Sequence, residues 1–416
     1  MNKRGIYIHI PFCVQKCNYC AFLSFNAESS PRKEYTDALV QEIRRRGEAL
    51  GHPEVDTVYV GGGTPSVLDL SQMRDIMTAV SESFSVKPDA EMTIEANPGT
   101  LGRKDGVTLA KLQAYKYLGF NRLSMGVQSM ENDRLHFLGR IHTAENVARD
   151  MELIRRKGFE NVNLDLIFSV PGESTQDALS DLKKVLDLKP EHVSCYSLQI
   201  EEGTPFGRMA EEGELTEVPD EEDRRTYHEI CRALKEAGYE HYEISNFARL
   251  PEGSAGCGFG DSGADTASPL RSQHNSLYWD MDDYIGLGLG ASGFAGGVRY
   301  KNTDDIEEYF AAISEGRFPL AEEHLNTPFD NISEAVFTGL RRREGISYEE
   351  AAAAYRAAGG ENNAASAEQL FWQVFKDAEE EAREYADRGL LIIDSEGLRL
   401  TEQGIDISNS IMSLFV

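Results

Sequence analysis

The sequence predicts a partial (β/α)6 barrel of the TIM type, followed by a mostly helical C-terminal domain that ends in a winged-helix-like fold. Six short β-branched or apolar segments alternate with helical patterns along the first half of the 416-residue chain. Strands that alternate with helices predict right-handed βαβ units and a parallel sheet. Polar or glycine-rich residues accompany five successive segments, as the βα loops of a barrel would require. A flat, doubly wound sheet is the alternative that this pattern leaves open.

Each expected strand is a short run bounded by polar or glycine residues, and an expected helix precedes the next strand. The strands are expected at residues 5–10, 55–62, 91–98, 121–128, 161–172 and 192–203. The helices are expected at Tyr35–Glu48, Leu70–Phe84, Gly106–Leu118, Ala144–Lys157 and Thr175–Leu188. Ser174, with Asp177 three residues later, provides an N-terminal cap for the last of these helices.

The chain is expected to divide into three segments. Residues 1–240 would form the barrel, 241–301 a connector, and 302–416 the C-terminal domain. The last segment ends in a helix, a hairpin (LLIID-SEG-LRLT) and a second helix, which indicates the winged-helix-like fold. Residues 249–273 contain five glycines and Cys257, a composition typical of a mobile loop. A solvated insertion and a lid over a ligand both fit this loop.

The net charge of −28 argues against a nucleic-acid partner, because phosphate binding depends on clustered Lys and Arg. It also argues against purely electrostatic attachment to a membrane. The sequence has no apolar run of about 18 residues that would span a bilayer. The N-terminus, MNKRGIYIHIPFC, lacks the pattern of a secretory signal. We therefore expect a cytoplasmic protein in which the scattered Cys195, Cys231 and Cys257 are reduced.

Three cysteines lie within eight residues directly after the first expected strand. Cys13, Cys17 and Cys20 have the spacing C-x3-C-x2-C, and no fourth cysteine is nearby. A structural zinc site would need a fourth ligand, which His9 or Cys257 could provide. An iron–sulfur cluster accepts three cysteines when a substrate or cofactor occupies the remaining iron. The spacing therefore predicts a metal centre that has one position open for a ligand.

The cysteines share their place in the expected barrel with four other chemical features. GGGTPS (residues 61–66) follows the second strand, Glu95 ends the third, Gln128 ends the fourth, and Asp165 lies in the fifth. Glycines let backbone groups approach a ligand closely, and carboxylates accept hydrogen bonds from an ammonium or a ribose. Each feature alone could be a tight turn, a cap or an ion-pair partner. Because they meet at the C-terminal ends of the strands, together they predict one binding site.

The cysteine spacing after a first strand resembles that of the radical S-adenosylmethionine (radical-SAM) superfamily. The resemblance implies a [4Fe–4S] cluster held by the three cysteines, with the amino and carboxylate groups of SAM on the fourth iron. The segments GIYIHIPFC, YVGGGTPS, RLSMGVQS, LGRIHTAEN, LDLIFSVPGES and YEISNFA resemble the oxygen-independent coproporphyrinogen III oxidase family. That resemblance runs from Gly5 to about Gly290 and resumes in the C-terminal domain. It implies SAM contacts from Tyr7, Tyr19, Gly62, Gly63, Thr64, Glu95, Gln128, Arg140 and Asp165.

Two departures from the true coproporphyrinogen dehydrogenases favour the HemW-type haem chaperone branch of this family. The dehydrogenases have an N-terminal extension, whereas twelve residues precede Cys13 here. They also have a further cysteine separated from the third by one residue, where this chain has Phe22. Smaller departures are Ala21, where the branch usually has an acidic residue, and SVPGES in place of Gly-x-Pro-x-Gln-Thr. These smaller differences bear on individual SAM contacts and leave the cluster motif intact.

The branch also carries a motif that is present here as HNSLYW, residues 274–279. Neutral imidazole is a common axial ligand of haem iron, so the resemblance implies haem contacts from His274, Tyr278 and Trp279. Without the resemblance, the motif is a loop histidine beside two half-buried aromatic residues. The expected function is a haem chaperone that delivers haem to an acceptor protein, with flavodoxin or ferredoxin as a reasonable electron donor. The alternative is a radical-SAM enzyme that acts on a tetrapyrrole, by coproporphyrinogen decarboxylation or haem breakdown.

Overall fold

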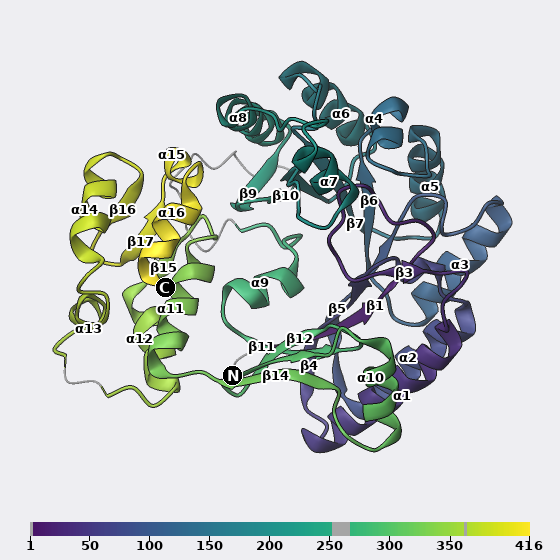
Figure 1. The fold of residues 1–416 in the computed structure, drawn as a ribbon, viewed down its shortest axis with the longest axis horizontal. Coiled ribbons are helices and arrows are strands. Elements are labelled where there is room, and N and C mark those ends of the chain that lie inside the picture. The colour runs from purple at the N-terminus through teal and green to yellow at the C-terminus, as the bar shows by residue number, and fades with distance from the viewer. Residues whose placement is uncertain (1–2, 252–266, 362–363) are drawn as a thin grey trace.

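A twelve-stranded sheet forms the centre of the computed structural model, which describes residues 3–251, 267–361 and 364–416 (Figure 1). Six parallel strands form its middle: β1 (Arg4–Ile10), β4 (Glu54–Gly62), β5 (Ser85–Ala96), β6 (Arg122–Gln128), β7 (Asn161–Phe168) and β8 (His192–Ser197). They lie side by side in the order of the chain. A doubly wound sheet would reverse its order beside the first strand. The order therefore confirms the partial barrel and excludes the flat alternative.

Further strands extend both edges of this six-stranded unit. Beside β1 lie β11 (Asp283–Leu287), β12 (Ser292–Ala295), β13 (Val298–Asn302) and β14 (Leu320–Leu325); beside β8 lie β10 (Asn246–Arg249) and β9 (Tyr239–Glu243). β11 is parallel to β1, whereas the other added strands pair in antiparallel fashion. The sheet thus continues past residue 302, where the sequence analysis begins the C-terminal domain. The three-part division of the chain stays a prediction.

Helices cover the outer face of the parallel strands. They are α1 (Arg32–Ala49), α2 (Leu70–Ser83), α3 (Asp105–Tyr117), α5 (Ala144–Arg156), α6 (Thr175–Asp187) and α8 (Asp220–Glu236), with α4 (Asn132–Phe137) and α7 (Pro205–Glu211) in loops and α10 (Ile306–Ser314) beside α1. All five helices expected from the sequence are present. The cap of α6 is confirmed as well, because the Ser174 hydroxyl accepts a hydrogen bond from the Asp177 backbone N–H at 3.2 Å.

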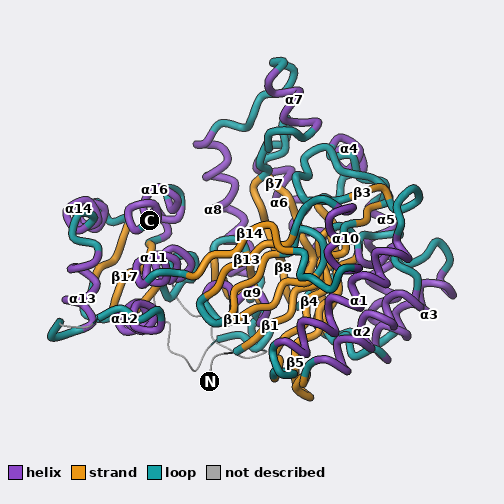
Figure 2. The backbone as a smooth tube through the Cα atoms, turned by 60° about the horizontal axis from the view of Figure 1, so that its bottom comes forward, coloured by secondary structure: helices purple, strands orange, loops and turns teal. Residues whose placement is uncertain are grey.

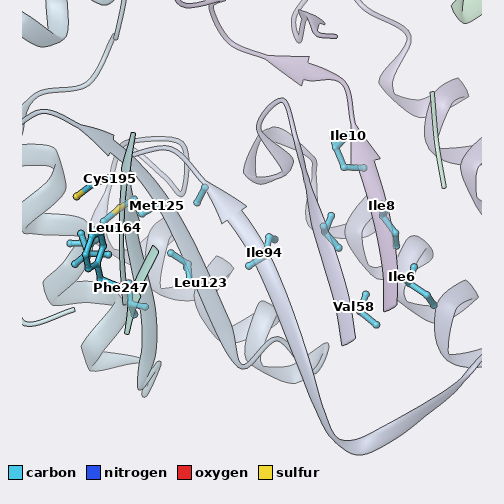
Figure 3. Close-up of a cluster of buried hydrophobic side chains, with 14 of the residues drawn as sticks. Ile6, Ile8, Ile10, Val58, Ile94, Leu123, Met125, Leu164, Cys195 and Phe247 are labelled. Carbon is cyan, nitrogen blue, oxygen red and sulfur yellow. The ribbon is translucent and has the colours of Figure 1, made fainter. Parts of the chain in front are cut away.

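Alternation of side chains along the strands separates an apolar outer layer from a polar interior. Ile6, Ile8 and Ile10 of β1 are fully buried and belong to one cluster with Leu39 and Ile43 of α1 (Figure 3). Successive side chains in a strand point to opposite faces. The residues between these isoleucines therefore face the inside of the barrel. The same alternation in the neighbouring strands places their polar residues around one interior space.

The C-terminal domain is mostly helical and lies beside the barrel (Figure 2). Its elements are α11 (Pro328–Gly339), β15 (Ile346–Ser347), α12 (Tyr348–Ala357), α13 (Ala367–Val374), α14 (Glu379–Asp387), β16 (Leu391–Ile393), β17 (Gly397–Leu400), α15 (Glu402–Ile405) and α16 (Ser408–Met412). The expected helix–hairpin–helix order is thus present, with β17 between β15 and β16. The Arg343 backbone N–H donates to the Tyr242 carbonyl at 3.0 Å and attaches this domain to β9. Within the described part of the chain, no helix has the length and hydrophobicity to cross a membrane.

Candidate functional site

A cavity of about 520 Å³ lies inside the barrel, and the cysteine loop forms part of its wall. The lining brings together eleven of the twelve residues that the sequence assigns to the cluster and to SAM: Cys13, Cys17, Tyr19, Cys20, Gly62, Gly63, Thr64, Glu95, Gln128, Arg140 and Asp165. These residues come from segments up to about 150 positions apart, which the strand order places side by side. These eleven residues therefore surround one cavity, as predicted.

Tyr7 is the one member of this set that does not line the cavity. Its hydroxyl is 3.0 Å from His9 Nδ1, and its ring centroid lies 6.2 Å from that of Tyr59. Tyr59 does line the cavity, and its hydroxyl donates to Glu95 Oε1 at 2.6 Å. Burial raises the pKa of Tyr7 far above its ordinary value, so its hydroxyl stays neutral. Tyr7 therefore lies outside the cavity and supports the ring of Tyr59, which lines it.

The three cysteines of the loop are free thiols, and two of them accept hydrogen bonds from neighbouring side chains. The Thr64 hydroxyl donates to Cys13 Sγ at 3.5 Å, and Arg140 Nη1 donates to Cys17 Sγ at 3.4 Å. Burial raises the pKa of Cys13 and of Cys20, while a hydrogen bond from the Phe22 backbone opposes the rise at Cys20. A bound cation would favour the thiolates of Cys13 and Cys20 against this rise, which fits a metal centre.

Among the described residues, the side chains at this loop do not form a site for a single zinc ion. Both ring nitrogens of His9 are engaged, Nδ1 with the Tyr7 hydroxyl and Nε2 with the Leu23 carbonyl at 3.1 Å. In the described residues, no three His, Cys, Asp or Glu side chains converge where one ion could be held. Three thiols spread along a cavity wall match a cluster instead, because its cysteines bind different iron atoms. Cys257, the other fourth ligand considered, lies outside the described residues.

Glu95 lines the cavity and is hydrogen-bonded to the glycine run. Its Oε2 accepts the Gly62 backbone N–H at 3.1 Å. Gly62 has a φ of +107°, and a Cβ there would lie 2.5 Å from the ring of His9, so only glycine fits. Burial first, and then the charge of Asp165, raise the pKa of Glu95 to about 7. The Glu95 carboxylate can accept a hydrogen bond from an ammonium group. The positive charge of such a group would favour the ionised form of Glu95.

Arg122 supplies a positive charge beside these acids that the sequence analysis did not single out. It is 2% exposed, lines the cavity, and has its Nε 4.0 Å from Glu91. Burial raises the pKa of Asp165, while hydrogen bonds from Asn163 and Ser194 and the charge of Arg122 oppose the rise. The positive charge of Arg122 also lowers the pKa of Glu95, because it stabilises the ionised carboxylate. The guanidinium therefore helps to keep a carboxylate site ionised inside the barrel.

Several cavity residues escaped the sequence analysis although a signal for them exists. Tyr59 pairs with Tyr7, Ser124 with Glu95, and Ser194 with Asp165. Asn163 and Tyr196 lie two residues from Asp165 and Ser194 in the same strands, so they face the same side. A polar residue at alternate positions of an otherwise buried strand marks the inner face of a barrel. Applying that period to every strand would have found this set. Asn97 and Asn275 also line the cavity from positions outside the strands.

Gln128 and Arg140 complete the wall near the cysteines. Gln128 ends β6 after a register shift and has a φ of 70°, a left-handed conformation that is uncommon outside glycine. Such strained backbone clusters at functional sites. Arg140 Nη2 donates to Asn97 Oδ1 at 2.5 Å and to the Gly126 carbonyl at 2.7 Å. Only the family resemblance predicted a place for Arg140 in this wall.

The HNSLYW motif lies at the opposite end of the strands, on α9 (Gln273–Trp279). Figure 1 shows this helix between the barrel and the C-terminal domain. His274 is 1% exposed; its Nδ1 is 2.7 Å from Thr57 Oγ1 and its Nε2 is 2.8 Å from the Tyr278 hydroxyl. A Cβ at Gly5 would lie 2.7 Å from Leu277, so glycine permits the close approach of α9 to β1.

The motif is therefore part of a helix, and not of the loop that local sequence indicates. Burial, and then the charge of Arg122, lower the pKa of His274 to about 3, so the ring is neutral. Trp279 packs against the guanidinium of Arg341, 4.5 Å from the ring centroid. His274, Tyr278 and Trp279 do not line the cavity, whereas Asn275 does. Haem contact by these three residues stays a prediction, and iron ligation by His274 would require Nε2 to give up its bond with Tyr278.

Known proteins share both the sequence and the fold. The chain matches the Radical SAM superfamily over residues 7–185 and the HemN C-terminal domain over residues 326–407. Heme chaperone HemW of Bacillus subtilis is 34% identical over 99% of both chains, and that of Escherichia coli is 35% identical over 70% of this chain and 69% of its own. The solved structure of Escherichia coli coproporphyrinogen III oxidase (HemN) superimposes with a TM-score of 0.80 at 22% identity, covering 100% of this chain and 90% of that one.

The structural likeness supports the fold alone, because its sequence identity is low. The sequence relationship carries more, since a curated relative above 30% identity aligns with nearly the whole chain. The cysteine loop, the glycine run and most of the C-terminal domain lie within the matched regions. The chain belongs to the heme chaperone HemW family of radical SAM proteins.

Proposed function

We propose that this chain is a haem chaperone that binds haem, a [4Fe–4S] cluster and SAM, and that delivers haem to an acceptor protein. Its relatives from Bacillus subtilis and Lactococcus lactis are named heme chaperones and align over at least 98% of their own chains. The observation that carries the proposal is the cavity, in which three free thiols face eight of the nine residues predicted to contact SAM.

The chain's own residues divide the work of holding these groups. The thiolates of Cys13, Cys17 and Cys20 would hold three irons, which leaves the fourth for SAM. Glu95 and the glycine run would receive the methionine end of SAM, because a carboxylate accepts from the N–H groups of its amine and the backbone of Gly62 lies close by. Asp165 would accept from a ribose. When bound, the cluster supplies one-electron chemistry to SAM.

Several finer features belong to the same proposal. Haem contact is assigned to His274, Tyr278 and Trp279 through the family motif, with an opening of α9 as its condition. A cytosolic flavodoxin or ferredoxin would supply electrons, and the protein would act in the cytoplasm without a nucleic-acid partner. Phe22 supports the chaperone over the dehydrogenase: it lines the cavity, is 70% exposed, and offers an apolar surface where the dehydrogenases have a cysteine.

An anaerobic assay with a parallel titration tests the proposal. The reconstituted protein is mixed with SAM, a reductant and coproporphyrinogen III, and protoporphyrinogen IX and 5′-deoxyadenosine are measured. Haem is titrated into a second sample and followed by absorbance. The proposal predicts saturable binding of one haem per chain and no protoporphyrinogen IX. Formation of protoporphyrinogen IX would instead make the protein a dehydrogenase, and absence of haem binding would refute the chaperone function.

A further inference from the structure

Asn97, directly after β5, connects the hydrogen-bond donors of two cluster cysteines. Its Nδ2 donates to Thr64 Oγ1 at 2.8 Å, and its Oδ1 accepts from Arg140 Nη2 at 2.5 Å. Thr64 in turn donates to Cys13 Sγ, and Arg140 Nη1 donates to Cys17 Sγ. A continuous chain of four hydrogen bonds therefore runs from one thiol to the other, with the Asn97 amide at its centre.

The direction of each bond in this chain follows from the types of donor. A guanidinium can only donate, so Arg140 must face the carbonyl oxygen of the Asn97 amide. The NH2 group of that amide must then face Thr64 and occupy a lone pair of its hydroxyl. A hydroxyl has one proton, which is left to point at Cys13. The fixed charge of Arg140 thus determines, through Asn97, that Thr64 donates to sulfur and does not accept from a thiol.

The surroundings of Asn97 hold the amide in this place. Its backbone N–H donates to Thr100 Oγ1 at 3.2 Å, and the Thr100 hydroxyl donates back to the Asn97 carbonyl at 2.5 Å. On the far side, a Cβ at Gly126 would lie 2.7 Å from Asn97 Oδ1, so the neighbouring strand leaves no room beyond glycine. Arg140 is held by the Gly126 carbonyl as well. The amide is therefore fixed from its backbone and from both of its ends.

We infer that Asn97 is a positioning residue that keeps Thr64 and Arg140 aimed as hydrogen-bond donors at the sulfurs of Cys13 and Cys17. The inference rests on the proposed cluster. Hydrogen bonds to cluster sulfurs help to set its reduction potential. A donor stabilises the negative charge that an added electron brings, so this arrangement raises the potential. Asn97 thereby tunes how readily the cluster accepts an electron without touching it.

Redox titration of reconstituted variants, followed by electron paramagnetic resonance (EPR), tests the inference. Asn97→Ala should take up the wild-type amount of iron and sulfide but have a more negative potential. At the wild-type midpoint, the ratio of reduced to oxidised cluster should fall several-fold; a tenfold fall corresponds to about 59 mV for a one-electron couple. In a Thr64→Val background the shift caused by Asn97→Ala should be smaller, because one of the two donors is already absent.

Controls separate the inference from a structural role and from the cluster proposal. Asn132→Ala on α4 should keep the wild-type potential, since that side chain bonds the backbone of Ala144 on the surface. If Asn97→Ala takes up no cluster, the pair Thr64→Ser and Thr64→Val decides: the inference predicts an unchanged potential for serine and a lower one for valine. Equal potentials in Asn97→Ala and wild type, or in the Thr64 pair, would overturn it. Failure of the wild type to take up iron would refute the cluster proposal instead.

Discussion

The two ends of the barrel interior carry the two strongest motifs of the sequence, yet their polar atoms are used in opposite ways. At the cysteine end, three free thiols and the side chains of Glu95 and Asp165 face an open cavity. At the α9 end, both nitrogens of His274 bond to protein hydroxyls, and its ring stacks on Tyr59 at 5.1 Å. One end is prepared for a ligand, and the other is closed by its own side chains.

The difference teaches that a motif gives the residue types at a place but not the partners of their atoms. A cysteine triplet has no internal partner that would satisfy three thiolates, so its spacing alone indicates a ligand. A histidine can ligate iron or complete a core, and both roles require a neutral ring. Only the neighbours decide between them, and Thr57 precedes His274 by 217 residues.

The largest expected effect is at the cysteine end. Cys20→Ala should abolish assembly of the cluster, because two remaining cysteines hold too few irons, while the fold stays largely intact. Iron and sulfide content after anaerobic reconstitution measures this. Cys231→Ala is the matched control, since Cys231 is outside the cavity, and should keep full content. Full iron content in Cys20→Ala would remove Cys20 from the ligands and weaken the contrast between the two ends.

The next effect concerns the pH dependence of SAM binding. The pKa of Glu95 is raised to about 7, so below that pH its carboxylate is protonated and no longer accepts, as a charged group, from the N–H groups of the SAM amine. SAM affinity should therefore fall with decreasing pH, by up to about tenfold per pH unit below 7. Calorimetric titration of SAM between about pH 5.5 and about pH 8.5 measures this change in affinity. The range extends about 1.5 pH units to each side of the pKa of Glu95.

Two variants sharpen this prediction. Glu95→Gln should bind SAM more weakly and lose the dependence on pH near 7. In the wild type, the guanidinium of Arg122 favours the ionised form of Glu95. Arg122→Gln removes this charge and should therefore move the inflection to higher pH. An inflection that stays in place in Glu95→Gln would assign the titration to another group.

At the α9 end, His274→Ala should destabilise the fold and leave the cluster unaffected. The change removes a buried stacked ring and leaves the Thr57 and Tyr278 hydroxyls without their partner. We expect a loss of about 2–4 kcal/mol in the free energy of unfolding, measured by urea denaturation. Iron content should equal that of the wild type. A stable variant with wild-type unfolding would show that the bonds of His274 contribute nothing to closing this end.

Haem retention in the same variant tests the remaining prediction for the motif. His274→Ala is predicted to weaken haem retention, and Tyr278→Phe is a companion variant that keeps the aromatic ring proposed to contact haem. The phenylalanine keeps the ring but leaves His274 Nε2 free, so retention should be kept or improved if that nitrogen binds iron. Equal haem affinity and absorbance in wild type and His274→Ala would return His274 to a purely structural role.

A smaller effect is expected on stability in acid. The pKa of His274 is about 3 in the folded protein and about 6.5 in the unfolded chain, so the unfolded state binds more protons between these values. Stability should therefore decrease as the pH falls below 6.5, by about 2 kcal/mol from this group at pH 5. Comparing unfolding at pH 7 and pH 5 in wild type and His274→Gln isolates the contribution. The same pH dependence in both proteins would contradict it.

Much of the barrel could be predicted from the sequence, because its signals are local. Strand and helix patterns placed all six parallel strands, and the cysteine triplet with the glycine run located the cavity. What local patterns could not supply is the partner of each polar atom. Asn97 received no attention because its role depends on Thr64 and Arg140, 33 positions before it and 43 after it. Arg122 was missed because its neighbours come from several strands.

The most direct test of the account compares the two ends in one experiment. EPR spectra of the reduced, reconstituted wild type, Cys20→Ala and His274→Gln are recorded with and without SAM. We predict a cluster signal that SAM changes in both the wild type and His274→Gln, and no cluster signal in Cys20→Ala. Loss of the cluster or of its response to SAM in a folded His274→Gln protein would contradict the account, because His274 would then take part in the ligand site.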